Sequence, residues 1–194
     1  MTRFPSYDRI AVSLHWLIAA GVVAQIALGW WMIDIPKLPA GVRAYWFNLH
    51  KSIGLTLAAL IVIRIVWRLT HRPPPMPASV PLWQARVASV SHVLMYVCMI
   101  VMPLAGYLGS IYSGYPIKYF GSTLPGWGAK DDTLKEFFST VHYATAWLFM
   151  TLISLHVAAA VKHLLDRDDI FARMWPRARP ASADSAPIVR RQGT

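Results

Sequence analysis

Residues 137–165 read FFSTVHYATAWLFMTLISLHVAAAVKHLL, an almost unbroken run of apolar side chains. It is long and apolar enough to cross a bilayer, which takes about 20 mostly apolar residues. It also carries two histidines, His142 and His156, fourteen positions apart. On an α-helix this spacing returns a side chain to within about 40° of the same face, roughly 21 Å further along the axis. Because imidazole is costly in hydrocarbon, we interpret the pair as functional.

Three further apolar runs have membrane-spanning length, at about residues 11–33, 49–69 and 87–112. The chain is 56% hydrophobic and only 14% charged, with nine Trp and eight Tyr. This composition is typical of a membrane protein with several spans. We therefore expect an all-α membrane protein, a four-helix transmembrane bundle formed by one domain over residues 1–176, with the lipid bilayer as its surroundings.

Two segments outside the runs have a different character. Residues 70–81 include Pro73, Pro74 and Pro75, which favour an extended connector. Residues 177–194 mix Pro, Ala, Ser and Arg without apolar periodicity, and we expect a disordered cytoplasmic tail. The first run is too long for the apolar part of a secretory signal, so we expect it to be a retained span.

The net charge of +10 is distributed unevenly over the two sides of this topology. The side of the N-terminus, the second connector and the C-terminal segment holds thirteen basic residues: Arg3, Arg9, Arg64, Arg68, Arg72, Arg86, Lys162, Arg167, Arg173, Arg177, Arg179, Arg190 and Arg191. The opposite side holds six: Lys37, Arg43, Lys51, Lys118, Lys130 and Lys135. Since basic loops stay inside, we expect both termini in the cytoplasm. Basic residues so placed are topology signals, and we expect no nucleic-acid partner.

This topology gives each histidine a depth. His50 begins the second run and His142 lies near the start of the fourth, so the two form an outer pair. His156 is favoured for an inner pair because it shares the helix face of His142, and His15 is its preferred partner. Four histidines compete for the two inner places: His15, His92, His156 and His163.

The fourteen-residue spacing recurs on the other runs. Gly29, Gly106 and Arg64 each lie fourteen residues beyond a histidine. The two glycines fall at the outer level, where the absence of a side chain would let a flat macrocycle approach the backbone. Arg64 falls at the inner level, where its guanidinium would either pair with a haem propionate or extend to the membrane interface.

Four histidines in two depth-matched pairs predict two haems, each with two imidazole ligands. Cys98 is the single cysteine and no C-x-x-C-H motif occurs, so any haem is non-covalent. There are two alternatives to haem binding: the histidines bind zinc or copper, or they only pack the helices together. The spans lack Asp and Glu except at their edges, which argues against a proton pump. Because two imidazoles leave iron without an open site, the predicted chemistry is electron transfer.

Several short motifs together resemble the bacterial cytochrome b-561 family of small di-haem membrane cytochromes. The resemblance covers residue 7 to about residue 176, and it implies that the protein lies in the bacterial inner membrane. Its motifs are SLHW at 13–16, LHKSIG at 49–54, LKE at 134–136 followed by VH at 141–142, and LHVAAA at 155–160 with His163 after it.

The resemblance implies that His15 with His156, and His50 with His142, ligate two b haems, and that the protein exchanges electrons with quinone. Some members of the family oxidise superoxide outside and reduce ubiquinone, so we expect both as substrates. We nominate His163 to hydrogen-bond the quinone, and no catalytic residue is assigned. The alternative is a cytochrome b subunit that relays electrons between a hydrogenase or dehydrogenase partner and quinone.

Overall fold

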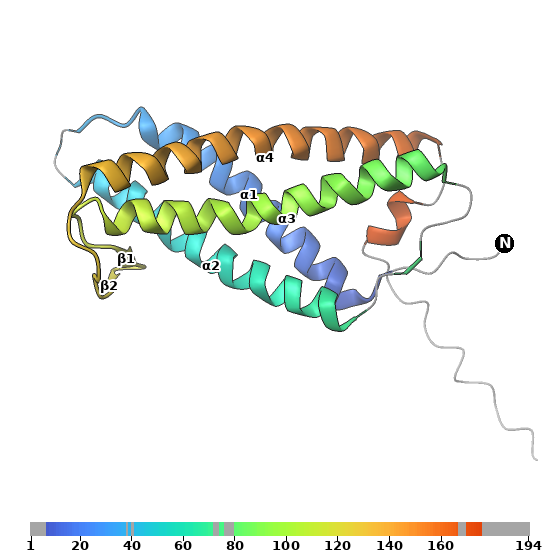
Figure 1. Cartoon of the computed structure of the whole chain (residues 1–194), viewed down its shortest axis with the longest axis horizontal. Helices are drawn as coiled ribbons and strands as arrows, with labels where there is room; N and C mark the ends of the chain where they lie inside the picture. Colours follow the sequence, from blue (N-terminus) through green and yellow to red (C-terminus); the bar gives the residue numbers. More distant parts are fainter. Residues whose placement is uncertain are drawn as a thin grey trace, which may run out of the picture.

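The computed structural model describes residues 7–37, 39, 41–71, 74–75, 80–166 and 170–175. Four long helices run alternately in opposite directions along the molecule (Figure 1). They are α1 (Arg9–Ile33), α2 (Val42–Thr70), α3 (Leu82–Ile111) and α4 (Asp132–Asp166). All four are long and apolar enough to cross a membrane. The expected all-α, four-helix membrane architecture is therefore confirmed, while the tail expected at 177–194 lies outside the described residues.

Three helices start well before the apolar runs from which they were predicted. Helix α2 begins at Val42, α3 at Leu82 and α4 at Asp132, whereas the corresponding runs were placed at 49, 87 and 137. The added turns carry polar and aromatic side chains such as Arg43 and Tyr45. Hydropathy marks only the part of a helix that suits hydrocarbon, but backbone hydrogen bonding continues past it.

The helix ends follow the local sequence. Asp8 caps α1 because its carboxylate accepts the backbone N–H of Ala11 at 2.9 Å. Helix α2 ends at Thr70, directly before the proline-rich connector, and α3 begins after Pro81. Proline cannot continue a helix, so the run of prolines that begins at position 73 of the sequence ends α2 where the sequence predicts.

The bundle is built from two helical hairpins. Helix α1 packs mainly on α2, and α3 packs mainly on α4, while α2 and α3 touch less extensively. A buried cluster of Met95, Cys98, Phe149 and Leu152 fills the middle of the bundle. Phe149 lies seven residues from each histidine of α4, so this apolar cluster separates the two histidine levels. Many large apolar side chains remain exposed around the outside, as expected for helices surrounded by lipid.

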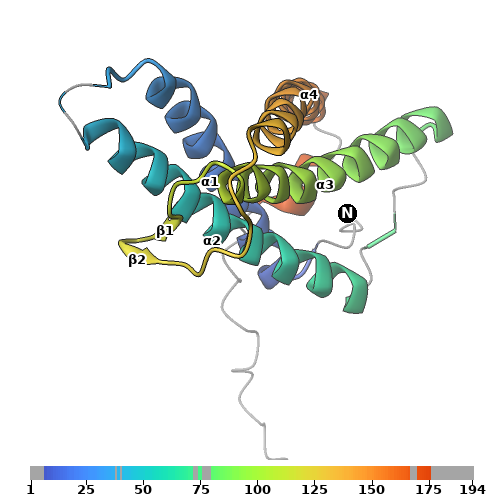
Figure 2. The same cartoon turned by 60° about the vertical axis from the view of Figure 1, so that its left-hand side comes forward.

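A small β-hairpin, which the sequence did not predict, covers α2 at one end of the bundle (Figure 2). Strands β1 (Lys118–Tyr119) and β2 (Ser122–Thr123) pair antiparallel through a turn in which Gly121 has φ +97°. The fully buried hydroxyl of Ser52 accepts the N–H of Phe120 at 3.0 Å. We call this end the hairpin end, and the end where α1 starts and α4 finishes the terminal end.

The terminal end carries a short 3₁₀ helix, η1 (Phe171–Met174), which also escaped prediction. The indole N–H of Trp16 donates to the carbonyl of Met174 at 2.7 Å. The buried guanidinium of Arg173 donates to the carbonyls of Pro74 and Pro75 at 2.8 and 2.9 Å. The chain after α4 therefore folds back and ties the connector between α2 and α3 to the start of α1.

Candidate functional site

Two pairs of histidines face each other between the helical hairpins, one pair near each end of the bundle. The rings of His50 on α2 and His142 on α4 have centroids 6.3 Å apart and planes inclined at 76°. The rings of His15 on α1 and His156 on α4 have centroids 6.3 Å apart and planes inclined at 72°. All four side chains are half-buried. The structure therefore brings together both pairs that the sequence predicts, with matching geometry.

The separation within each pair fits two imidazoles that share one metal atom. A ligating imidazole nitrogen lies about 2 Å from the metal and about 1 Å from the centre of its own ring. Two rings on opposite sides of one metal atom therefore have centroids about 6 Å apart. Within the described residues, no three His, Cys, Asp or Glu side chains gather to hold a metal ion. The pairs thus suit a metal that brings its other ligands with it, as haem iron does.

The tautomer of His142 is fixed by a backbone carbonyl. Its Nδ1 lies 2.9 Å from the carbonyl oxygen of Met102 on α3. A carbonyl only accepts hydrogen bonds, so Nδ1 carries the proton and donates it, which leaves Nε2 free to bind a metal. On the other side of the pair, Nδ1 of His50 is buried and has no hydrogen-bond partner among the described residues.

The two glycines selected by their spacing lie against this hairpin-end pair. A Cβ added at Gly106 would stand 3.0 Å from Nδ1 of His142. A Cβ added at Gly29 would stand 3.4 Å from Cε1 of His50. The glycines therefore lie at the level predicted for them, and the group to which they give space in this structure is the imidazole itself.

One polar residue near this pair was missed in the sequence. The side-chain amide of Gln25 on α1 donates to the backbone carbonyl of His50 at 2.8 Å. Its Oε1 is buried and has no hydrogen-bond partner in the described part of the chain. An amide inside an apolar run is itself a signal, because it must find partners inside the bundle. Gln25 ties α1 to α2 at the level of His50.

A third histidine approaches the pair at the terminal end. His92 on α3 has its ring centroid 5.4 Å from that of His156, with the planes inclined at 67°. This separation differs from the 6.3 Å shared by the two facing pairs. The remaining candidate, His163, is half-buried near the end of α4, seven residues beyond His156. Among the ring contacts of the described residues at this end, the contact of His15 with His156 matches the geometry of His50 with His142.

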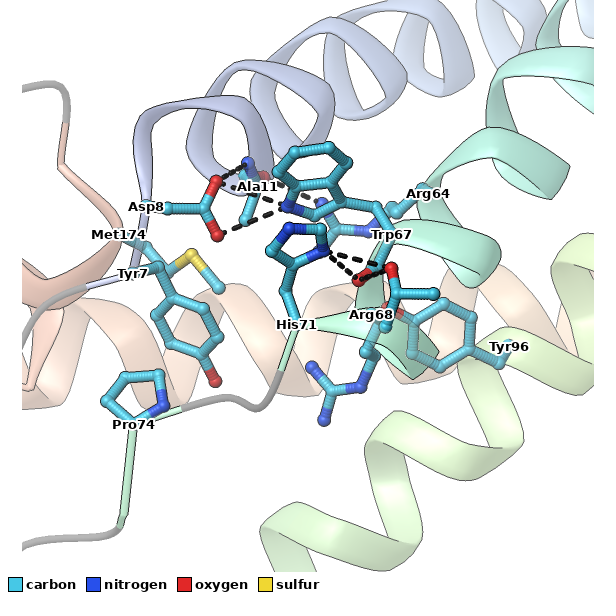
Figure 3. A pocket seen from close by; sticks show the side chains of 11 residues that line it. Tyr7, Asp8, Ala11, Arg64, Trp67, Arg68, His71, Pro74, Tyr96 and Met174 are labelled. Carbon is cyan, nitrogen blue, oxygen red and sulfur yellow. Dashed lines mark hydrogen bonds between the residues drawn. The ribbon is translucent and has the colours of Figure 1, made fainter.

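Arg64 reaches the terminal-end pair, as its spacing predicts. Its Nη1 donates to the carbonyl of Ala11 at 3.0 Å, and its Nη2 lies 3.4 Å from Nδ1 of His15. Beside it lies a cavity of about 500 Å³ between the start of α1, the last turns of α2 and η1 (Figure 3). Arg64, Arg68 and Tyr96 are among its lining residues.

Asp8 forms part of the cavity wall and is held as a carboxylate. Burial alone would raise its pKa, but hydrogen bonds from the N–H of Ala11 and the indole N–H of Trp67 lower the pKa below 3.8. The indole of Trp67 in turn stacks on His71, with ring centroids 3.8 Å apart (Figure 3). These contacts fix the start of α1 to the end of α2.

Known proteins match nearly the whole chain. A family model described as prokaryotic cytochrome b561 matches residues 6–177. Cytochrome b561 homolog 2 of Escherichia coli K12 is 34% identical over 179 residues, which cover 87% of this chain and 90% of the relative. Cytochrome b561 homolog 1 of the same organism is 25% identical over 186 residues, covering 92% and 100%. The Probable superoxide oxidase CybB of Yersinia pestis is 24% identical over 175 residues, covering 89% and 97%.

Proposed function

The chain belongs to the prokaryotic cytochrome b561 family, and from this premise we propose that it oxidises superoxide outside the inner membrane and reduces ubiquinone. Family membership confirms the resemblance inferred from the sequence. It also makes the protein a membrane electron-transfer protein that uses b-type haem. The number of haems, their ligands, the substrates and the orientation belong to the proposal.

The proposal assigns one non-covalent haem b to each facing pair, His15 with His156 and His50 with His142. The observation that carries it is the 6.3 Å separation shared by the two pairs. Gly29 and Gly106 give space at the hairpin-end pair, and Arg64 is placed to hold a propionate at the terminal-end pair. His92 packs beside His156 without being a ligand.

Haem b bound in this way supplies reversible one-electron oxidation and reduction of iron. The two imidazoles of each pair would both bind the iron and would leave it no open position for a substrate. The buried apolar cluster around Cys98 and Phe149 lies between the two pairs. The protein thereby provides two redox positions across one membrane, which suits electron transfer rather than oxygen binding.

Superoxide is proposed as the donor at the hairpin end, which faces outward if both termini are cytoplasmic. That end carries six basic residues against four acidic ones, Asp34, Asp131, Asp132 and Glu136, so its charge favours a small anion. Lys51 directly follows His50 and is half-buried beside it. A relative over most of this chain bears the name Probable superoxide oxidase. Each superoxide gives up one electron and becomes O₂.

Ubiquinone is proposed as the acceptor near the terminal end, with His163 as a hydrogen-bond partner for a quinone carbonyl. Two electrons from two superoxide anions and two protons convert one quinone to one quinol. His163 lies seven residues beyond His156, so the two share a face of α4. Protons are available at this end from the cytoplasmic side.

Purified protein in liposomes that contain ubiquinone tests this function. With superoxide generated outside, we expect superoxide loss and ubiquinol formation in a ratio of about two to one, fixed by the electron balance. His142→Ala should abolish both signals. Tyr143→Ala is the matched control, because Tyr143 is exposed on the neighbouring position of α4, and it should retain activity. Haem that is reduced by dithionite but not by superoxide would favour the electron-relay subunit and contradict the proposal.

A further inference from the structure

Two arginines on successive turns of α2 face the cavity at the terminal end. Arg64 and Arg68 both line it, together with Tyr96 of α3 and Met174 of η1. Figure 3 shows the side chains of Arg68 and Tyr96 beside one another, and the guanidinium carbon of Arg68 lies 5.6 Å from the centre of the Tyr96 ring. The volume of about 500 Å³ lies within the range of small-molecule sites.

Neither guanidinium forms an ion pair with a residue that the structure describes. In the part of the chain that the structure describes, the ion pairs are Lys130 with Asp132 and Lys162 with Asp166. Asp8 also lines the cavity, but its carboxylate is engaged by Trp67 and Ala11. Two adjacent cations at the edge of an apolar bundle are costly without a partner, and guanidinium binds carboxylate oxygens in preference to neutral groups.

Tyr96 provides a second, independent sign that the cavity takes a ligand. Its hydroxyl is buried and has no hydrogen-bond partner among the described residues. A buried hydroxyl without a partner costs free energy, so an acceptor that enters the cavity would stabilise it. Arg64 gives one of its five N–H donors to the carbonyl of Ala11, so the remaining donors of the two guanidiniums and this hydroxyl are available to an anionic oxygen group.

Arg64 connects this donor set to the haem site. Its Nη2 lies 3.4 Å from Nδ1 of His15. When Nε2 of a histidine ligates a metal, Nδ1 carries the proton and can only donate. An arginine side chain also only donates hydrogen bonds. In the haem-bound tautomer, His15 therefore cannot accept a hydrogen bond from Arg64. The guanidinium of Arg64 then needs a different acceptor.

We propose, resting on the two-haem function above, that this cavity receives the propionate carboxylates of the haem held by His15 and His156. Arg68 and the hydroxyl of Tyr96 hold them in addition to Arg64. The cationic pocket makes this haem the more easily reduced of the two, because positive charge near iron favours the form that has gained an electron. Electrons that enter at the hairpin end are thereby drawn to the terminal end.

Potentiometric titration of the purified protein, followed through the reduced haem absorbance, tests the proposal. Arg68→Gln is the main variant, because Arg68 is exposed and makes no hydrogen bond to the described protein that its loss would break. We expect the reduction equilibrium of the terminal-end haem to shift about tenfold toward the oxidised form, which is about 59 mV, with the other haem unchanged. Arg68→Lys keeps the charge and should recover most of the shift. Arg86→Gln removes a charge on α3 outside the cavity and should leave both haems as in the wild type.

Infrared difference spectra with isotope-labelled propionates give a second readout. The carboxylate bands of one haem should move in Arg68→Gln and in Tyr96→Phe, and stay in place in Arg86→Gln. A wild-type chain without two b haems overturns this inference together with the proposed function. If the chain binds two haems but Arg68→Gln changes neither their potentials nor their carboxylate bands, the cavity assignment is wrong and the proposed function stands. If the same variant instead loses quinone reduction with unchanged potentials, the cavity holds quinone and the assignment is wrong.

Discussion

Gly106 lies directly against the imidazole of His142. A Cβ at this glycine would stand 3.0 Å from Nδ1 and 3.1 Å from Cε1 of the ring. The same ring donates from Nδ1 to the carbonyl of Met102, one helical turn earlier on α3. The absence of a side chain at Gly106 thus lets α3 approach α4 closely enough to orient the histidine. Gly106 leaves space for the ring of His142, and the carbonyl of Met102 fixes the orientation of that ring.

Gly106→Ala should therefore displace His142. A methyl group at this distance forces the ring or the backbone to move, and such overpacking typically costs about 1–3 kcal/mol. We expect the variant to bind the haem of the hairpin-end pair several-fold more weakly, while the terminal-end haem stays in place. Haem content after detergent dilution measures this.

Gly109→Ala on the same helix is the matched control, because an added Cβ there meets only ordinary contacts at 3.5 Å or more. It should retain both haems. Equal haem loss in the two variants would mean that α3 tolerates no added methyl group at either position. The contact between Gly106 and His142 would then not explain the loss.

Ser52→Ala should loosen the β-hairpin from α2. The hydroxyl of Ser52 is buried, accepts the N–H of Phe120 at 3.0 Å and lies 3.2 Å from the carbonyl of Lys118. Removing it leaves the N–H of Phe120, in the turn between β1 and β2, without its partner, which costs about 1–3 kcal/mol. We expect a lower midpoint of thermal unfolding and faster proteolysis at the hairpin. Ser154→Ala, whose hydroxyl is exposed and bonds only to its own helix, should change neither.

Asp8 predicts a pH dependence at the terminal end. Its pKa in the folded protein lies below 3.8, so its contribution to stability is complete above that pH and is lost as the pH falls through the folded value. Asp8→Asn keeps an N-cap but removes the charge. Wild type should unfold at a higher temperature than Asp8→Asn at neutral pH, and the difference should vanish well below pH 3.8. A difference that persists in acid would show that the carboxylate charge is unimportant.

The pairing of the histidines is the part of the site that the sequence predicts best. The spacing of His142 and His156 fixes two levels on one helix face, and the matching of apolar runs gives each level a partner, so depth alone selects His50. The sequence left His15 and His92 in competition because both fall near the terminal end. Only the tilt and contacts of α1 and α3 separate them, and these depend on packing across the bundle.

The features that the sequence did not predict depend on contacts between distant segments. The β-hairpin has two-residue strands, too short for an alternating pattern, and is held by Ser52, which precedes it by more than sixty residues. The 3₁₀ helix after α4 is fixed by Trp16 and by the connector carbonyls that Arg173 reaches. The roles of Gln25 and Tyr96 depend on their surroundings in the folded bundle. Gln25 donates to the carbonyl of His50, and the buried hydroxyl of Tyr96 has no partner among the described residues.

The ratio of haem to protein in single histidine variants tests the central claim most directly. We predict two b haems per chain in the wild type, because two pairs share the 6.3 Å separation. His142→Ala and His156→Ala should each retain one haem, and His92→Ala should retain two. Loss of a haem from His92→Ala combined with full retention in His15→Ala, or a wild-type ratio of one, would contradict the account.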